Sequence, residues 1–270
     1  MGRAEAKERI VFMKQGFLII SEGTLDPEGR EDLRIMKEEI EGRFPDSITT
    51  VAFTDENARK ALREQEGIKV KGIRAAMLQM KEEGVQSLAA ITTEVMESRA
   101  FDAEKEEIHG CAALFSEMKI AGPLIKTEED IPLFSRCMAG VFSRDFQDKV
   151  PVAVVEKELA PSAEGILPAL EASLRSQLSP EAHVISLMGG KRTKKMLAEI
   201  EGDPVNRTIG YIPMSFLGGP AFEERLSDGE RSPAGRTRAA GHIPHFHVKG
   251  LGAYDEFLRL YLKRLYEACR

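Results

Sequence analysis

The second half of this chain repeats the first, and this repeat constrains the fold more than any other feature of the sequence. Residues 16–45 read GFLIISEGTLDPEGREDLRIMKEEIEGRFP, and residues 150–180 read VPVAVVEKELAPSAEGILPALEASLRSQLSP. Each segment has an apolar run, a turn with Glu, Leu and Pro, a helical stretch and a closing Pro. Glu22 of the first segment corresponds to Glu156 of the second. Such self-similarity predicts two copies of one α/β unit with a cleft between them.

Strand and helix patterns alternate along both halves. Short apolar runs typical of buried parallel strands occur at 17–20, 48–53, 85–92, 118–122, 152–155, 183–188, 208–216 and 245–249. Stretches with helical spacing lie between them, at 27–44, 56–66, 73–83, 100–117, 128–142, 164–178, 193–201 and 254–268. The expected fold class is α/β, with two similar doubly wound, parallel-sheet domains related by internal duplication. We place the N-terminal domain at 1–145 and the C-terminal domain at 146–270.

One segment lacks either pattern. Residues 227–241 read SDGERSPAGRTRAAG and are rich in Gly, Ser, Pro and Arg. This composition predicts a loop or a mobile lid.

Composition and charge exclude several classes of protein. With 44 acidic and 38 basic residues the net charge is −6, which argues against a general nucleic-acid or anionic-membrane binder. No stretch approaches the roughly 18 apolar residues of a membrane span, and the first 20 residues lack the apolar core of a signal peptide. The three cysteines show no CxxC spacing. We therefore expect a cytoplasmic protein with reduced thiols and no nucleic-acid or membrane partner.

Two acidic residues stand at equivalent strand ends of the repeat, namely Glu22 and Glu156. These ends should face each other across the predicted cleft. Two carboxylates in one cleft can bind a cation or serve as an acid–base pair. The alternative is a pair of solvated loop carboxylates.

Imidazole groups cluster near the C-terminus. His245 and His247 alternate along a predicted strand, which places both rings on one face, and His242 is close in sequence. Paired imidazoles at this spacing can ligate a metal. The alternative is a strand face that holds no metal.

Several motifs resemble one known family over nearly the whole chain. The strand and loop FLIISEGT at 17–24, followed by Asp26-Pro27 and Arg30, resemble the opening of the anaerobic cobalt chelatases (sirohydrochlorin cobaltochelatases). Further matches are Phe44-Pro45, Ala52-Phe53-Thr54, GIKV at 67–70 and VKGLG at 248–252. The resemblance implies a two-domain lyase that inserts Co(II), or sometimes iron, into sirohydrochlorin during cobalamin or sirohaem biosynthesis. Related proteins often self-associate, so a homo-oligomer is compatible with it.

The resemblance also implies which residues to compare with the metal-binding positions of the family. These are a His after the fifth strand, a Glu after the sixth and a second His after the seventh. They fall on Glu156, Gly189 and Pro220 in this chain, and none of the three is retained. Metal insertion as a cobaltochelatase therefore needs substitute residues.

Candidate substitutes follow from the motifs above. We expect Glu156 and Glu22 as catalytic residues, and Glu156, His245 and His247 as ligands of Co(II) or another divalent metal. Sirohydrochlorin carries eight carboxylates, and guanidinium groups and strand-end glycines suit such anions. The expected tetrapyrrole-binding residues are therefore Gly23, Thr24, Gly218, Gly219, Arg225 and Arg231.

Three hypotheses for the function remain open. The first is a chelatase-type protein that binds a small-molecule tetrapyrrole, a divalent metal or both, and inserts the metal through substitute ligands. The second is a non-catalytic paralogue that carries or senses a tetrapyrrole or a metal. The third is an unrelated cleft enzyme that uses Glu22 and Glu156 as acid and base.

Overall fold

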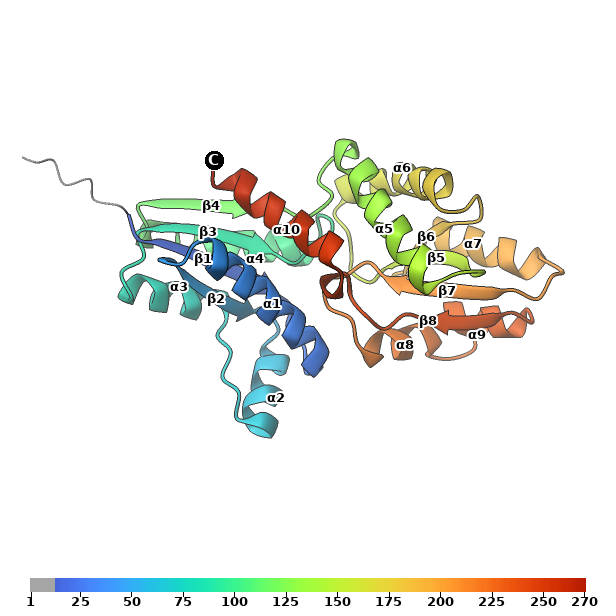
Figure 1. The fold of residues 1–270 in the computed structure, drawn as a ribbon. Helices are drawn as coiled ribbons and strands as arrows, with labels where there is room; N and C mark the ends of the chain where they lie inside the picture. The colour runs from blue at the N-terminus through green and yellow to red at the C-terminus, as the bar shows by residue number, and fades with distance from the viewer. Residues whose placement is uncertain (1–12) are drawn as a thin grey trace, which may run out of the picture.

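The computed structural model describes residues 13–270. This part of the chain contains two parallel sheets of four strands each (Figure 1). The first sheet has the strands β1 (Gln15–Ser21), β2 (Ile48–Phe53), β3 (Ser87–Thr92) and β4 (Glu117–Ala121). The second has β5 (Val150–Val155), β6 (His183–Ser186), β7 (Thr208–Pro213) and β8 (Ile243–Phe246). We call the unit around the first sheet the N-lobe and that around the second the C-lobe.

Both sheets have the same strand order, which confirms the predicted duplication. The order is β2-β1-β3-β4 in the N-lobe and β6-β5-β7-β8 in the C-lobe, and every pair is parallel. The strands alternate their apolar side chains between two buried faces: Phe17 and Ile19 of β1 point to one face, while Leu18 and Ile20 point to the other. The fold is therefore the expected α/β class with helix-covered parallel sheets.

Helices connect the strands throughout. The N-lobe contains α1 (Pro27–Arg43), α2 (Glu56–Glu66), α3 (Ile73–Glu82) and α4 (Arg99–His109), and a 3₁₀ turn at Ala112–Leu114. A 3₁₀ turn at Glu128–Asp130 leads into α5 (Ile131–Asp145). Then follow α6 (Pro161–Gln177), α7 (Lys191–Gly202), α8 (Pro220–Ser227), α9 (Pro233–Ala239), a 3₁₀ turn at Leu251–Ala253 and α10 (Asp255–Ala268).

The ends of α2 show how local sequence sets an element. The Asp55 side chain accepts a hydrogen bond from the Asn57 N–H, at 2.8 Å, and so caps the first turn. Gly67 ends the helix with φ 71°, a left-handed conformation that favours glycine. Leu62 is fully buried on the inner face. Both ends lie where the sequence predicts them.

Two sequence-based predictions were wrong at the level of elements. The stretch 100–117 is not one helix, because α4 ends at His109 and Glu117 already begins β4. The stretch 227–241 is not an irregular loop, because α9 forms within it. Ser232 accepts a hydrogen bond from the Gly235 N–H, at 3.0 Å, and Pro233 occupies the first helical position. A capped start and two buried residues, Ala234 and Thr237, make this short Arg-rich segment helical.

The closing helices of the two halves cross between the lobes. In Figure 1 the last helix, α10, lies over the N-lobe sheet, where it packs on β3 and β4. Helix α5 instead packs against α6 of the C-lobe. One apolar cluster therefore contains Phe17 of the N-lobe, Val184 of the C-lobe and Tyr261 of α10. The proposed boundary at residue 145 separates the two sheets. Helices α5 and α10, however, each pack on the lobe on the other side of this boundary.

Helices long and apolar enough to span a bilayer do not occur within residues 13–270.

Candidate functional site

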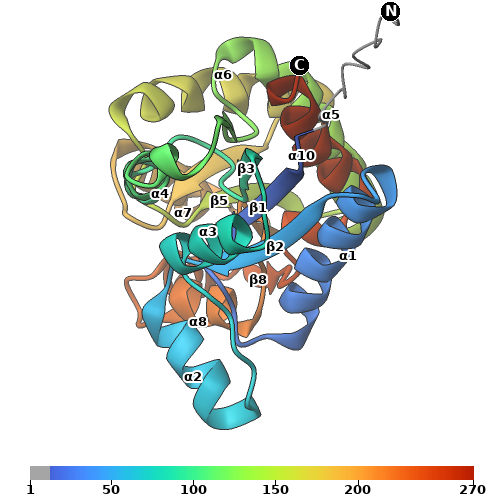
Figure 2. The ribbon, with the colours of Figure 1, turned by 90° about the vertical axis from the view of Figure 1, so that its left-hand side faces the viewer.

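A cleft of about 840 Å³ lies where strands from both lobes end. It is lined by the residues that follow β1, β3, β5 and β7, so both sheets contribute through the carboxyl ends of their strands. Residues of α2 and α8 also line it, and Figure 2 shows these helices on the same side of the molecule. Carboxyl ends of parallel strands are where α/β folds usually bind ligands.

Apolar side chains form most of the cleft wall. They come from both lobes and include Leu25, Val95, Met96, Val155, Leu159, Met214, Phe216 and Leu217. A wall of this kind suits the face of an apolar or aromatic ligand, and the few polar groups then decide its orientation.

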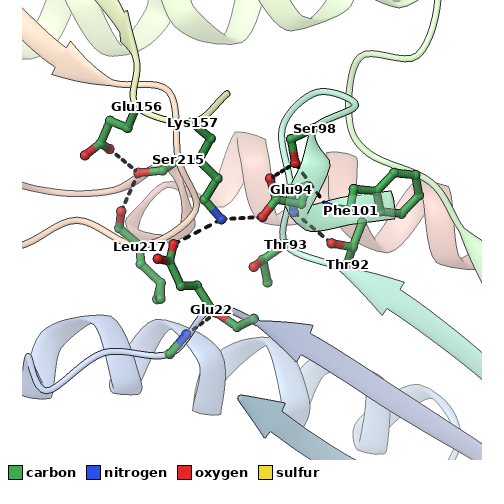
Figure 3. A network of polar contacts seen from close by, with 12 residues as sticks. Glu22, Thr92, Thr93, Glu94, Ser98, Phe101, Glu156, Lys157, Ser215 and Leu217 are labelled. Atoms are coloured by element: carbon green, nitrogen blue, oxygen red, sulfur yellow. Dashed lines mark hydrogen bonds and ion pairs between the residues drawn. The ribbon is translucent and has the colours of Figure 1, made fainter. Parts of the chain in front are cut away.

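Lys157 is the central charge of the cleft and joins the two lobes (Figure 3). It follows β5, and its Nζ lies 3.0 Å from Glu22 Oε2 and also pairs with Glu94 Oε1. Glu94 is only 5% exposed, whereas Glu22 is 57% exposed. Burial disfavours the charged ammonium, but the carboxylates of Glu94 and Glu22 outweigh burial and raise the pKa of Lys157. The ammonium therefore stays charged between two carboxylates.

Hydrogen bonds hold Glu94 in place. The Ser98 hydroxyl donates to Glu94 Oε2 at 2.9 Å, and the Glu94 N–H donates to Thr92 Oγ1 at 3.1 Å. The Thr92 hydroxyl donates in turn to Glu104 Oε2 at 2.6 Å. Burial, and then the nearby Glu94 carboxylate, raise the pKa of Glu104 to about 8 against the Thr92 hydrogen bond. Glu104 is therefore mostly neutral at pH 7.

Glu156 has its own cationic partner. It follows β5 directly, is 8% exposed, and pairs with the guanidinium of Arg225 from α8. The Ser215 hydroxyl lies 2.9 Å from Glu156 Oε1 and 2.5 Å from the Leu217 carbonyl oxygen. Glu22 and Glu156 thus line one cleft, as the sequence suggested, but each is bound to a different cation. This arrangement favours structural ion pairing over a proton shared between the two acids.

The predicted tetrapyrrole-binding residues are mostly found in the cleft. Its lining includes Gly23, Thr24, Gly218, Gly219 and Arg225, but not Arg231. A side chain at Gly218 would begin 2.0 Å from the Val248 carbonyl oxygen, so glycine lets the loop after β7 approach the loop after β8. This close contact fixes one wall of the cleft.

The predicted histidine ligands lie elsewhere. His245 and His247 share one face, as expected, but they pack on Phe146, with ring centroids 5.7 and 5.1 Å apart, and neither lines the cleft. His247 Nε2 instead contacts the Tyr254 hydroxyl. The structure thus does not bring Glu156 together with these imidazoles. Within residues 13–270, no group of three or more His, Cys, Asp and Glu side chains is arranged to hold a metal ion.

His242 has a structural position. It is 4% exposed, its Nδ1 accepts from the Arg207 N–H at 3.1 Å, and its Nε2 lies 2.7 Å from the Ile200 carbonyl oxygen. Both ring nitrogens are therefore occupied by the backbone.

Sequence reasoning missed Lys157. Its only signal was its position directly after Glu156, in a strand-end segment that the repeat already places at the cleft. Charged residues make up 30% of the chain, and a Lys in a loop is usually solvated, so the sequence did not distinguish Lys157 from the other lysines.

Comparison with known proteins identifies the family. The model of the family described as cobalt chelatase (CbiK) matches residues 15–270. The chain belongs to the cobalt chelatase family. This membership confirms the resemblance inferred from the motifs. No curated protein matches the sequence.

Two solved structures share the fold of this cobalt chelatase family member. SirB from Bacillus subtilis with Fe3+ has a TM-score of 0.63 at 15% identity, covering 95% of this chain and 96% of that one. The sirohydrochlorin chelatase SirB from Bacillus subtilis subspecies spizizenii in complex with cobalt has a TM-score of 0.62 at 13% identity, with 95% of both chains covered. At these identities the likeness shows the common two-lobed architecture.

The three positions at which the cobalt chelatase resemblance places metal ligands do not all lie in the cleft. Glu156 and Pro220 line the cleft, whereas Gly189 lies in the turn after β6, outside the lining. Of these, Glu156 alone has a side chain able to ligate a metal, and it is bound to Arg225. The cleft can thus hold an organic ligand against its apolar wall, while Lys157 and Arg225 pair with its central carboxylates.

Proposed function

We propose that this member of the cobalt chelatase family binds a tetrapyrrole in the interlobe cleft and does not insert a metal into it. The observation that carries the proposal is the cleft itself, with about 840 Å³ between the carboxyl ends of two duplicated sheets. Small-molecule sites span roughly 300–1,000 Å³, so this cleft is large enough for a macrocycle. Its apolar wall suits the face of a flat ring.

The charges of the cleft support binding over insertion. A chelatase must strip water from the metal, which is its substrate, and must take protons from the pyrrole nitrogens. Here the Lys157 ammonium lies between Glu22 and Glu94, and Arg225 holds Glu156. These carboxylates already have cations, so a metal ion would have to displace them. A carrier or sensor of a tetrapyrrole needs no such ligands.

Binding is tested by filling the cleft. We expect the absorption spectrum of sirohydrochlorin or coproporphyrin III to shift on addition of the protein under anaerobic conditions. Ala221 is an exposed residue of α8 that lines the cleft. We expect Ala221→Trp to weaken tetrapyrrole binding by about tenfold or more, because the indole occupies space that the ligand needs. Glu224→Trp, on the same helix but outside the lining, is the matched control and should bind normally. Equal affinity of both variants would place the ligand elsewhere.

Insertion is tested separately by the rate of metallation. Sirohydrochlorin and Co(II) are mixed anaerobically with and without the protein, and the spectrum of the metallated product is followed. We expect the same rate in both mixtures. An acceleration that depends on Glu156, judged from Glu156→Gln, would establish the substitute-ligand chelatase instead.

A further inference from the structure

A second cavity lies outside the cleft, at the outer edge of the N-lobe sheet. It has a volume of about 320 Å³ and shares no lining residue with the cleft. Figure 2 shows the edge strand β2 between α1 and α3, and all three elements contribute to the lining. The volume falls within the roughly 300–1,000 Å³ of small-molecule sites.

The cavity exists because the chain before α3 meets β2 at one point only. The Phe53 N–H donates to the Lys71 carbonyl oxygen at 2.9 Å, and Ala52 and Lys71 form a single parallel bridge. Residues 67–70, which come before this bridge, belong to no strand. A wedge therefore opens between β2 and this segment, and both line the cavity.

One backbone donor of β2 faces this wedge. Successive N–H groups of a strand point to opposite edges. The Thr54 N–H donates to the Ser21 carbonyl oxygen of β1 at 2.9 Å, whereas the Phe53 N–H points outward to Lys71. Val51 comes two residues before Phe53, so its N–H also points to the outer edge. Within residues 13–270 no further strand pairs with β2 there, so this N–H can donate to a bound anion.

The floor of the cavity is apolar. Leu33 of α1 and Phe53 of β2 line it and are each only 2% exposed. Val51 and Val70 are half-buried and pack against the same apolar cluster. A compact apolar group can therefore lose its contact with water here.

The charged residues of the lining are all cations, although the whole chain has a net charge of −6. They are Arg30, Arg34, Lys37, Lys69 and Lys71. Of the residues that the structure describes, no Asp or Glu lines this cavity. A lining with one sign of charge and an apolar floor attracts a ligand of the opposite sign.

Two of these cations are available to a ligand without breaking an ion pair. The three cations from α1 each pair with a Glu outside the lining. The pairs of Arg34 and Lys37 are exposed to solvent, and such pairs are weak enough to reorient toward a ligand. Lys69 and Lys71 pair with no carboxylate of residues 13–270, and Lys71 donates to the side-chain oxygen of Gln79 instead.

We infer that this cavity is a second ligand site, which binds a small organic anion with a compact apolar body and a phosphate or carboxylate group. The body packs on Leu33 and Phe53. The ammonium groups of Lys69 and Lys71 and the Val51 N–H donate to the anionic group. The site is separate from the cleft, so the inference does not depend on the proposed function.

The test compares four probes by isothermal titration calorimetry: 1-naphthyl phosphate, 1-naphthoate, 1-naphthol and inorganic phosphate. We expect one of the two naphthyl anions to bind at one site per chain, at least about tenfold tighter than 1-naphthol and inorganic phosphate. The tighter anion identifies the ligand group as a phosphate ester or a carboxylate. Added salt should weaken its binding, because it screens the attraction.

Charge variants test the location. Lys69→Gln/Lys71→Gln removes the two unpaired charges, so it should weaken the tighter anion by about tenfold and leave 1-naphthol within about twofold. Lys60→Gln/Lys81→Gln is the matched control, since it changes the net charge equally at exposed lysines outside the lining, and it should bind like the parent. Ala221→Trp, which fills the cleft, should also bind the anion normally.

Four results would overturn the inference. Equal affinity of Lys69→Gln/Lys71→Gln and the parent, or lost binding in Ala221→Trp, would place the anion elsewhere. Binding of 1-naphthol as tight as that of the anions would show an apolar groove without selectivity for charge. Binding of inorganic phosphate as tight as that of 1-naphthyl phosphate would show an adventitious ion only. Failure of both naphthyl anions to bind at millimolar concentration would exclude the site and leave tetrapyrrole binding in the cleft unaffected.

Discussion

At the scale of single residues, the chain provides its own cation where a metal-binding cleft would need an external one. Lys157 lies between Glu94, which is buried, and Glu22, which is largely exposed. A buried carboxylate that loses its only cation strongly destabilises a protein, whereas an exposed ion pair contributes little. The pair with Glu94 should therefore dominate the contribution of Lys157 to stability.

We predict that Lys157→Met lowers the free energy of unfolding by about 3 kcal/mol, because the Glu94 carboxylate is left without its cation. Lys157→Met/Glu94→Gln should recover most of this loss, since the neutral amide still accepts from Ser98. Arg99→Met breaks an exposed interlobe pair with Glu158, 3.1 Å long, and should cost less than about 1 kcal/mol. Urea unfolding measures all three, and a Lys157→Met variant as stable as the parent would refute the assignment.

Glu104 gives a second residue-scale prediction, one that depends on pH. Its pKa is about 8 in the folded protein against the ordinary 4.5, so the folded state holds a proton that the unfolded chain releases. The stability that the neutral carboxyl contributes is complete below pH 4.5 and is lost as pH rises through about 8.

We therefore expect Glu104→Gln, which stays neutral, to gain roughly 2–4 kcal/mol relative to the parent between pH 5 and pH 9. Urea midpoints at the two pH values give this difference. Glu106→Gln, an exposed neighbour on α4, is the control and should follow the pH dependence of the parent. Parallel curves for Glu104→Gln and the parent would show that Glu104 is ionised at neutral pH.

At the scale of elements, α10 shows how a helix far along the chain completes an early sheet. It packs on β3 and β4 and buries Phe257, Tyr261 and Leu265 completely. The Tyr261 hydroxyl donates to the Thr93 carbonyl oxygen at 2.9 Å, directly before Glu94. The last helix therefore supports the cleft from behind.

We expect Leu265→Ala to destabilise the protein by about 2–4 kcal/mol, because it leaves a cavity between α10 and the N-lobe sheet. Lys263→Ala, on the exposed face of the same helix, should change stability by less than about 0.5 kcal/mol. Thermal unfolding of the two variants measures the difference. A small effect of Leu265→Ala would mean that α10 is only loosely attached.

Elements whose signals are local could be predicted from the sequence, and those set by distant contacts could not. The apolar run of β1 and the 56–66 span of α2, which Asp55 and Gly67 delimit, have local signals, and the sequence predicts both correctly. Helix α9 was missed because seven residues rich in Arg carry too little periodicity, while the buried Thr237 that anchors it becomes visible only in the fold. The crossing of α5 and α10 likewise has no local signal.

The candidate site divides in the same way. The repeat placed Glu22 and Glu156 at strand ends, and both do line the cleft. Their partners could not be predicted, because Lys157 and Glu94 meet across the lobes and Arg225 comes from a later helix. The spacing of His245 and His247 placed them correctly on one face, but nothing in the sequence told which neighbour would cover that face.

At the scale of the whole molecule, the two lobes share one core. The largest apolar cluster of the described residues runs from Phe17 through Val184 to Leu265 and so includes both sheets and α10. The lobes also meet through the backbone, where the Ala160 N–H donates to the Glu97 carbonyl oxygen at 3.0 Å. Two units that bury apolar surface against a common set of helices should unfold together.

This shared core predicts a single unfolding transition for the proposed domains 1–145 and 146–270. The chain contains no Trp, so Phe44→Trp and Phe246→Trp each introduce one fluorescent reporter, the first in the N-lobe and the second in the C-lobe. In each variant we expect the denaturation midpoint from Trp fluorescence to coincide with the midpoint from circular dichroism. The comparison is made within one variant, so a change in stability caused by the substitution affects both probes equally. A fluorescence midpoint that differs from the circular dichroism midpoint of the same variant would show that one lobe unfolds alone. The lobes would then be two independent domains that pack against each other.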